Sequence, residues 1–130
     1  MGKYGSLISL IDGMASDFLF IDGREIDMPT AGKFLNNIDE LIKETDSLKV
    51  FQLKTVALGL NSLLEKIVLD DIDDKESGFN VLEKGIDLMQ EIGESFTNTG
   101  DYEGDIESFM ESIAVLTGER VSVEVKEASI

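Results

Sequence analysis

The sequence predicts a mainly α-helical protein, folded as an antiparallel four-helix bundle with one additional helix. Three observations support this prediction. Apolar residues recur every three or four positions along most of the chain, which is the period of one helix face. The only proline, Pro29, stands where the first turn of a helix tolerates a missing N–H. No internal repeat or low-complexity linker divides the chain, so we expect one domain over residues 1–130.

The first helix is expected over about residues 5–17. Two interpretations exist for the segment that follows it. Residues 18–27 read as a small β-hairpin, because Asp22-Gly23 suits a type I′ turn, whose central residues need positive φ. Alternatively, the first helix continues to Ile21 and ends at Gly23. We favour the hairpin. The apolar stripe of the first helix consists of Leu7, Leu10, Ile11, Met14 and Phe18.

The second and third helices follow Pro29. The second begins at this proline, and the third is expected from about Leu48 to Leu69. Apolar residues cover most of the circumference of the third helix, which is typical of a central helix. The stripe of the second helix consists of Phe34, Leu35, Ile38, Leu41, Ile42 and Leu48.

An acidic segment, residues 70–74, separates the third helix from a fourth, which Asp74 or Ser77 is placed to cap. The fifth helix is expected to begin near Tyr102 and to end at Gly118. Residues 120–125 alternate apolar and polar like a strand, and they either pair with the hairpin or fray. The seam of the fourth helix consists of Phe79, Leu82, Ile86, Met89, Gly93 and Phe96. The helical glycines Gly59, Gly85 and Gly93 indicate close backbone approach between helices or to a partner, and we favour close internal packing.

The composition excludes several classes of function. The formal charge of −16 disfavours nucleic acid and anionic membrane surfaces as partners. The chain has no cysteine and no histidine, so thiolate nucleophiles, imidazole bases and the sulfur and imidazole ligands of metal ions are missing. We therefore expect no enzyme activity, no cofactor and no metal. The N-terminal segment lacks the features of a signal peptide or a spanning helix, which favours a cytoplasmic protein.

Two acidic patterns invite a chemical interpretation. The cluster at residues 70–76 does not match the calcium loop of an EF-hand, because the sixth and twelfth positions counted from Asp71 are Glu76 and Leu82. A solvated, helix-capping loop is the better interpretation. Asp87 and Gln90 are spaced three apart, as in helical phosphatases that position an attacking water. A polar helix border explains the same spacing.

Residues 79–92, Phe-Asn-Val-Leu-Glu-Lys-Gly-Ile-Asp-Leu-Met-Gln-Glu-Ile, follow Leu64-Glu-Lys-Ile-Val68 and the acidic loop. This stretch resembles the later helices of histidine phosphotransfer (HPt) domains, especially the N-terminal domain of chemotaxis histidine kinases, over about residues 50–117. The resemblance implies an up-and-down four-helix bundle with an additional helix. It also implies a phosphorylatable histidine near a bundle midpoint, presented to a kinase and to receiver domains.

The sequence departs from that family at residues 39–51, where the histidine motif should fall. Asp46-Ser47-Leu48-Lys49 keeps a similar lysine spacing with aspartate in place of histidine, and no glycine follows. An aspartate does not inherit the chemistry of a neutral imidazole nucleophile. We therefore expect a degenerate HPt-like domain that lacks the phosphorylatable histidine.

The function expected from these observations is a non-catalytic protein-interaction module in two-component or chemotaxis-like signalling, with a receiver domain or a histidine kinase as partner. Its partner surface is expected around Glu40, Lys43, Glu44 and Asp46. The alternative is an acidic helical adaptor or oligomerisation protein unrelated to phosphotransfer, in which the seam from Phe79 to Phe96 would receive a partner helix. The oligomeric state is left open.

Overall fold

The computed structural model of the chain describes residues 4–19, 28–69, 71–72 and 74–118, and these residues form five α-helices. No strand occurs within these ranges. The predicted mainly helical fold is confirmed. None of the helices in this part of the chain is both long and apolar enough to cross a membrane. The helices are α1 (Gly5–Leu19), α2 (Met28–Leu48), α3 (Phe51–Val68), α4 (Lys75–Thr99) and α5 (Glu107–Thr117).

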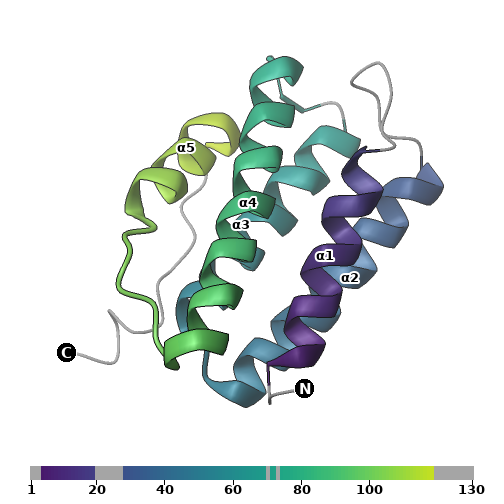
Figure 1. Ribbon diagram of the computed structural model, residues 1–130. Coiled ribbons are helices and arrows are strands. Elements are labelled where there is room, and N and C mark those ends of the chain that lie inside the picture. Colours follow the sequence, from purple (N-terminus) through teal and green to yellow (C-terminus); the bar gives the residue numbers. More distant parts are fainter. Residues whose placement is uncertain (1–3, 20–27, 70, 73, 119–130) are drawn as a thin grey trace.

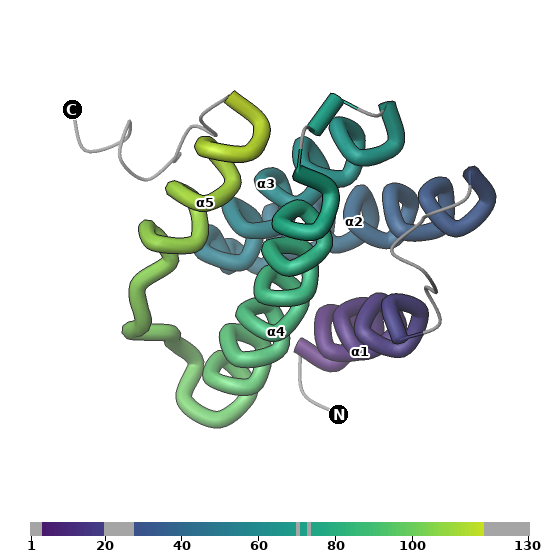
Figure 2. The backbone as a smooth tube through the Cα atoms, turned by 90° about the horizontal axis from the view of Figure 1, so that it is seen from above, coloured from purple at the N-terminus to yellow at the C-terminus, as the bar shows by residue number. Residues whose placement is uncertain are grey.

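The first four helices close a ring, and the fifth lies outside it. Helix α1 packs against α2 and α4, and α3 packs against the same two helices from the other side. Successive helices run in opposite directions, as Figure 1 shows. Helix α5 rests on α3 and α4, on the side away from α1, which is clear from above in Figure 2. This is an antiparallel four-helix bundle with an additional helix.

The apolar stripes predicted from the sequence meet in the middle of the ring. All six seam residues of α4, from Phe79 to Phe96, are buried, as are Leu7, Ile11 and Met14 of α1. Burying such side chains stabilises the fold by about 1.5–3 kcal/mol each. Helix α3 supplies the largest share of the centre, as its apolar circumference predicts, with Leu53, Val56, Ala57, Leu60, Leu63, Leu64 and Ile67 buried.

The hairpin predicted near residues 18–27 is wrong in its first two residues. Phe18 and Leu19 are helical, because Phe18 extends the apolar stripe of α1 and packs half-buried against the core. The alternative interpretation, a longer first helix, holds as far as Leu19. Residues 20–27, with the Asp22-Gly23 turn, and the strand-like residues 120–125 lie outside the described part of the chain.

The connection between α2 and α3 is a tight turn at residues 49 and 50, where the sequence predicted that the third helix had already begun. The third helix begins at Phe51 rather than near Leu48, because Lys49 leaves the helical path with a φ of 62°. The N–H of Lys49 bonds to the carbonyl of Asp46 at 3.3 Å, and that of Val50 bonds to the carbonyl of Thr45 at 2.9 Å. This pair of bonds is a Schellman motif, in which glycine normally occupies the left-handed position. Lysine takes that position here.

Two predicted helix boundaries are confirmed. Asp74 caps α4 by accepting a bond from the backbone N–H of Ser77 at 3.1 Å. Gly118 ends α5 in a left-handed conformation, with its N–H on the carbonyl of Ala114. Both caps satisfy backbone groups that a helix end leaves without an intrahelical partner.

Helical glycines allow the close packing that the sequence indicated. A Cβ atom at Gly93 would lie 2.8 Å from Cδ1 of Ile8, so α1 approaches the backbone of α4 there. A Cβ atom at Gly59 would lie 2.9 Å from Cε of Met110, which brings α5 onto α3 in the same way.

Candidate functional site

The predicted partner surface lies on the C-terminal half of α2. Glu40, Lys43 and Asp46 are exposed, and Glu44 is half-buried. Successive helical residues are about 100° apart around the axis, which places Lys43 and Glu40 opposite the buried Leu41–Thr45 side. Glu44 and Asp46 then fall on the two opposite borders of the exposed face. The structure therefore spreads the four residues across the width of the helix instead of gathering them in one cluster.

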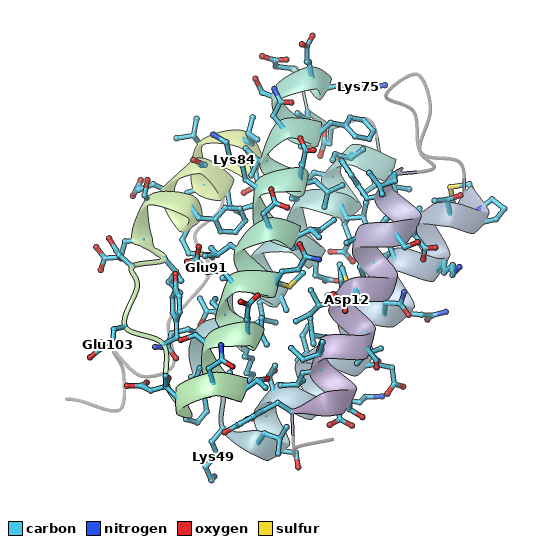
Figure 3. The ribbon with its side chains drawn as sticks, in the orientation of Figure 1. Asp12, Lys49, Lys75, Lys84, Glu91 and Glu103 are labelled. Carbon is cyan, nitrogen blue, oxygen red and sulfur yellow. The ribbon has the colours of Figure 1, made fainter. Side chains whose placement is uncertain are left out.

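Asp46 is engaged by a neighbouring helix. Its Oδ1 lies 3.0 Å from Nζ of Lys54 on α3, and the Lys54 side chain is 16% exposed against 65% for Asp46. Asp46 is also near the end of α2, two residues before Leu48, and therefore not at the midpoint of the helix. Lys49, which follows it in the left-handed turn, points away from this end of the bundle in Figure 3.

Lys43 is paired within its own helix. Its Nζ lies 3.2 Å from Oδ2 of Asp39, one turn earlier. The hydrogen bond to Asp39 raises the pKa of Lys43, and the negative charges of Asp39 and Glu40 raise it further. Lys43 therefore stays charged, as the basic centre of an otherwise acidic helix face.

Asp87 and Gln90 lie in different environments on α4. Asp87 is exposed on the outer face of α4, whereas Gln90 is half-buried at the border with α1. Nε2 of Gln90 donates a hydrogen bond to Oδ1 of Asp12 on α1 at 3.4 Å. Figure 3 shows Asp12 on the outer side of α1, where that helix runs beside α4. The amide thus links two helices at a polar border of the bundle.

The acidic loop before α4 serves as a helix cap. Ser77 donates from its hydroxyl to Asp74 at 2.7 Å as well as from its backbone, and both bonds lower the pKa of Asp74. Asp71 lies 3.5 Å from Nζ of Lys66 at the end of α3. Within the described residues, which omit Asp70 and Asp73, no group of three or more acidic side chains could hold a metal ion.

The seam from Phe79 to Phe96 is not open to a partner helix. Its residues are buried against the other helices of the same chain. Ile8 of α1 packs against Gly93, and Leu60 of α3 and Phe109 of α5 pack against Gly85. A partner helix could reach this seam only by displacing one of those elements.

The sequence did not predict the role of Tyr102, a buried residue that bonds to two helices. Tyr102 was expected on a face of the fifth helix, but α5 begins at Glu107, and Tyr102 belongs to the segment before it. That residue is only 8% exposed, and its hydroxyl donates to Oε2 of Glu91 on α4 at 2.8 Å. Gln52 of α3 donates from Nε2 to the Tyr102 carbonyl at 3.0 Å. A single aromatic residue between Gly100 and Gly104, among acidic neighbours, is the signal that could have identified it.

The environment of Tyr102 changes its acidity. Burial raises its pKa to about 12, with further contributions from the hydrogen bond to Glu91 and from the charges of Glu91 and Asp105. The phenol is therefore a neutral hydrogen-bond donor at physiological pH. In the described part of the chain, every buried side-chain nitrogen or oxygen atom has a hydrogen-bond partner.

Comparison with known proteins places the chain in no family. No family model matches it, no curated protein matches it, and no solved structure matches it.

Proposed function

We propose that this chain is a non-catalytic protein-interaction module, related to HPt domains and acting in a two-component or chemotaxis-like pathway. A receiver domain or a histidine kinase is its partner. The observation that carries the proposal is the antiparallel four-helix bundle with a fifth helix packed outside it, in a chain of 130 residues without a histidine. The bundle is the architecture that the resemblance implies, and the carrier chemistry of that family needs an imidazole.

The proposed docking surface is the exposed face of α2 from Glu40 to Asp46. Glu40 and Lys43 stand at its centre, and both sit on a helix that is held in place by buried Leu41 and Thr45. Asp46, tied to Lys54, extends the surface onto α3. Charges of both signs on a rigid helix give a partner an orientation, and rim charges of this kind act mainly on the association rate.

An assay of phosphoryl transfer distinguishes this function from that of a histidine-containing HPt domain. The chain is incubated with a radiolabelled, autophosphorylated chemotaxis histidine kinase and with a phosphorylated receiver domain. We expect no label on the chain after either incubation, and a histidine-containing HPt domain serves as the positive control. Stable label on the chain would overturn the proposal that it is non-catalytic.

A charge-reversal pair tests the surface. Lys43→Glu changes the centre of the α2 face, and Glu83→Lys changes an exposed residue on α4 and serves as a matched control. We expect Lys43→Glu to weaken binding of a stand-alone receiver domain about tenfold, which is about 1.4 kcal/mol. Glu83→Lys should leave the affinity within twofold. Equal effects of the two variants would remove α2 as the docking surface.

A further inference from the structure

Helix α5 packs on the outside of a ring of four helices. The ring of α1 to α4 closes through its own contacts, and α5 packs on α3 and α4 from outside. Helix α5 has 11 residues, and Ile113 is the one among them that is buried. Isolated helices of this length are marginal in water, so α5 depends on its docking contacts for stability.

Helix α5 packs on a surface of α3 and α4 that contains two glycines, Gly59 and Gly85. We call this surface the seat of α5. A Cβ atom at Gly85 of α4 would lie 2.8 Å from Cζ of Phe109, and one at Gly59 of α3 would lie 2.9 Å from Cε of Met110. Glycine inside a helix costs about 1 kcal/mol relative to alanine. Both glycines therefore weaken their own helices while giving room to the side chains of α5, and Gly85 also gives room to Leu60 of α3.

Residues 100–106 form a strap that leads from α4 to α5, and Tyr102 fixes the strap to both supporting helices. Its hydroxyl donates to Glu91 of α4, and its carbonyl accepts from Gln52 of α3. Figure 3 shows Glu91 on the side of α4 that faces the strap. Tyr102 thus bonds the strap to both helices on which α5 rests. The hydroxyl of Ser95 on α4 adds a hydrogen bond to the Asp101 carbonyl at 2.6 Å.

The strap and α5 carry an excess of negative charge. Between Gly100 and Gly118 the sequence contains five acidic residues and no basic one, and the whole chain has a formal charge of −16. Because the whole chain is acidic, we expect a net repulsion between exposed charges when the strap and α5 close onto the bundle at low ionic strength. Lys84 of α4, which lies beside α5 in Figure 3, offsets part of it. Salt screens such repulsion between exposed charges.

We propose that α5 and the strap form a lid that opens from the intact α1–α4 bundle as one unit, with Tyr102 as its latch and with ionic strength setting how often it opens. Opening uncovers the seat at Gly59 and Gly85. The lid is a low-stability unit of the fold, whereas the ring opens only in global unfolding.

The absence of cysteine allows a direct test with single thiols. Ile113→Cys reports on the lid and Ile38→Cys reports on the ring, and both positions are buried. We expect the thiol at position 113 to react with a thiol reagent at least tenfold faster than the thiol at position 38. Equal rates would show that α5 opens only when the whole protein unfolds, which would overturn the proposal.

Second substitutions distinguish lid opening from global unfolding. Ile11→Val in α1 removes one buried methylene far from α5, at a cost of about 1 kcal/mol. It should speed labelling at position 38 about fivefold and leave position 113 unchanged. Tyr102→Phe removes the hydroxyl bond of the latch to Glu91, keeps the carbonyl bond from Gln52, and should speed labelling at position 113 about fivefold. A parallel increase at positions 38 and 113 with Ile11→Val would contradict an independent lid.

Salt and hydrogen exchange complete the test. Raising the salt concentration from about 10 mM to 300 mM should slow labelling at position 113, because screening favours the closed lid. Unchanged or faster labelling would overturn the electrostatic part of the proposal. Native-state hydrogen exchange on the unsubstituted protein is the second measurement, since Ile113→Cys could itself loosen α5. Amides of α5 should exchange before those of α1 to α4, and simultaneous exchange would contradict the lid.

Discussion

The backbone N–H of Val50 donates to the carbonyl oxygen of Thr45 at 2.9 Å, and this bond closes the turn between α2 and α3. Both residues are fully buried, so the turn is part of the core as well as a connection. The bond requires the residue between Leu48 and Val50 to adopt a left-handed conformation. Lys49 does so with a φ of 62°, at a steric cost that glycine does not pay.

Replacing this lysine with glycine should therefore stabilise the protein. We expect Lys49→Gly to raise the free energy of unfolding by about 1 kcal/mol, because glycine adopts the left-handed conformation without a Cβ clash. Lys49→Ala is the control, since alanine keeps the Cβ atom and should bring no comparable gain. Urea denaturation of the three proteins measures the effect. A Lys49→Gly variant that is less stable than the Ala variant would contradict the account of this turn.

A methyl group at Gly85 should disturb the seat of α5. Its Cβ atom would lie 2.5 Å from Cδ2 of Leu60 and 2.8 Å from Cζ of Phe109. We expect Gly85→Ala to destabilise the protein by about 1–3 kcal/mol, because overpacking outweighs the gain in helix propensity.

Gly13 offers the matched control, since nothing lies within 4 Å of a Cβ atom there. Gly13→Ala should stabilise α1 by up to about 1 kcal/mol. Thermal unfolding followed by circular dichroism compares the two variants. If both raised the midpoint equally, close packing at Gly85 would be disproved.

Tyr102 should make stability depend on pH in the alkaline range. Because folding raises its pKa from about 10 to about 12, the folded state holds the proton more tightly than the unfolded state. The stabilising contribution is full below about pH 10 and is lost as the pH rises through about 12. Tyr102→Phe should remove this dependence and cost about 1 kcal/mol at pH 7.

The titration itself can be observed. The chain has two tyrosines, so the tyrosinate absorbance of a Tyr4→Phe variant reports on Tyr102 alone. We expect a midpoint near 12, in contrast to an exposed phenol near 10. A midpoint near 10 would mean that Tyr102 is neither buried nor bonded to Glu91.

Asp74 should make stability depend on pH in the acidic range. Its stabilising contribution should be lost as the pH falls, whereas that of Tyr102 is lost as the pH rises. The bonds from Ser77 lower its pKa below 3.8, so the folded state favours the carboxylate. Its contribution is present above the pKa of the unfolded state and is lost as the pH falls through the folded value. Asp74→Ala should lower the unfolding midpoint at pH 7, whereas Asp74→Asn should keep most of the cap and lose its pH dependence. Denaturant unfolding at pH 7 and pH 3 measures both effects.

The helices were predictable because their apolar spacing is a property of the sequence alone. The seam of α4 and the stripe of α1 are buried as their three- and four-residue spacings predict. Asp74 and Gly118 were predictable because capping depends on local chemistry. Both signals act within one helix or at its end.

Features that depend on tertiary contacts were not predictable. Lys49 adopts a left-handed conformation although local chemistry favours glycine, because buried Val50 and Thr45 fix the turn. Tyr102 follows the apolar spacing of a helix, but its bonds to two other helices hold it in the strap. The division of the α2 surface, with Asp46 drawn to Lys54, likewise depends on the neighbouring helix.

The proposed function is tested most directly by titrating the isotope-labelled chain with a stand-alone chemotaxis receiver domain, activated with beryllofluoride, and following the backbone amide resonances. We predict chemical-shift changes concentrated between Glu40 and Asp46, which Lys43→Glu reduces and Glu83→Lys does not. Saturable changes centred on α1 and α4, or no change at millimolar receiver concentration, would contradict the proposal that this bundle binds receivers through α2.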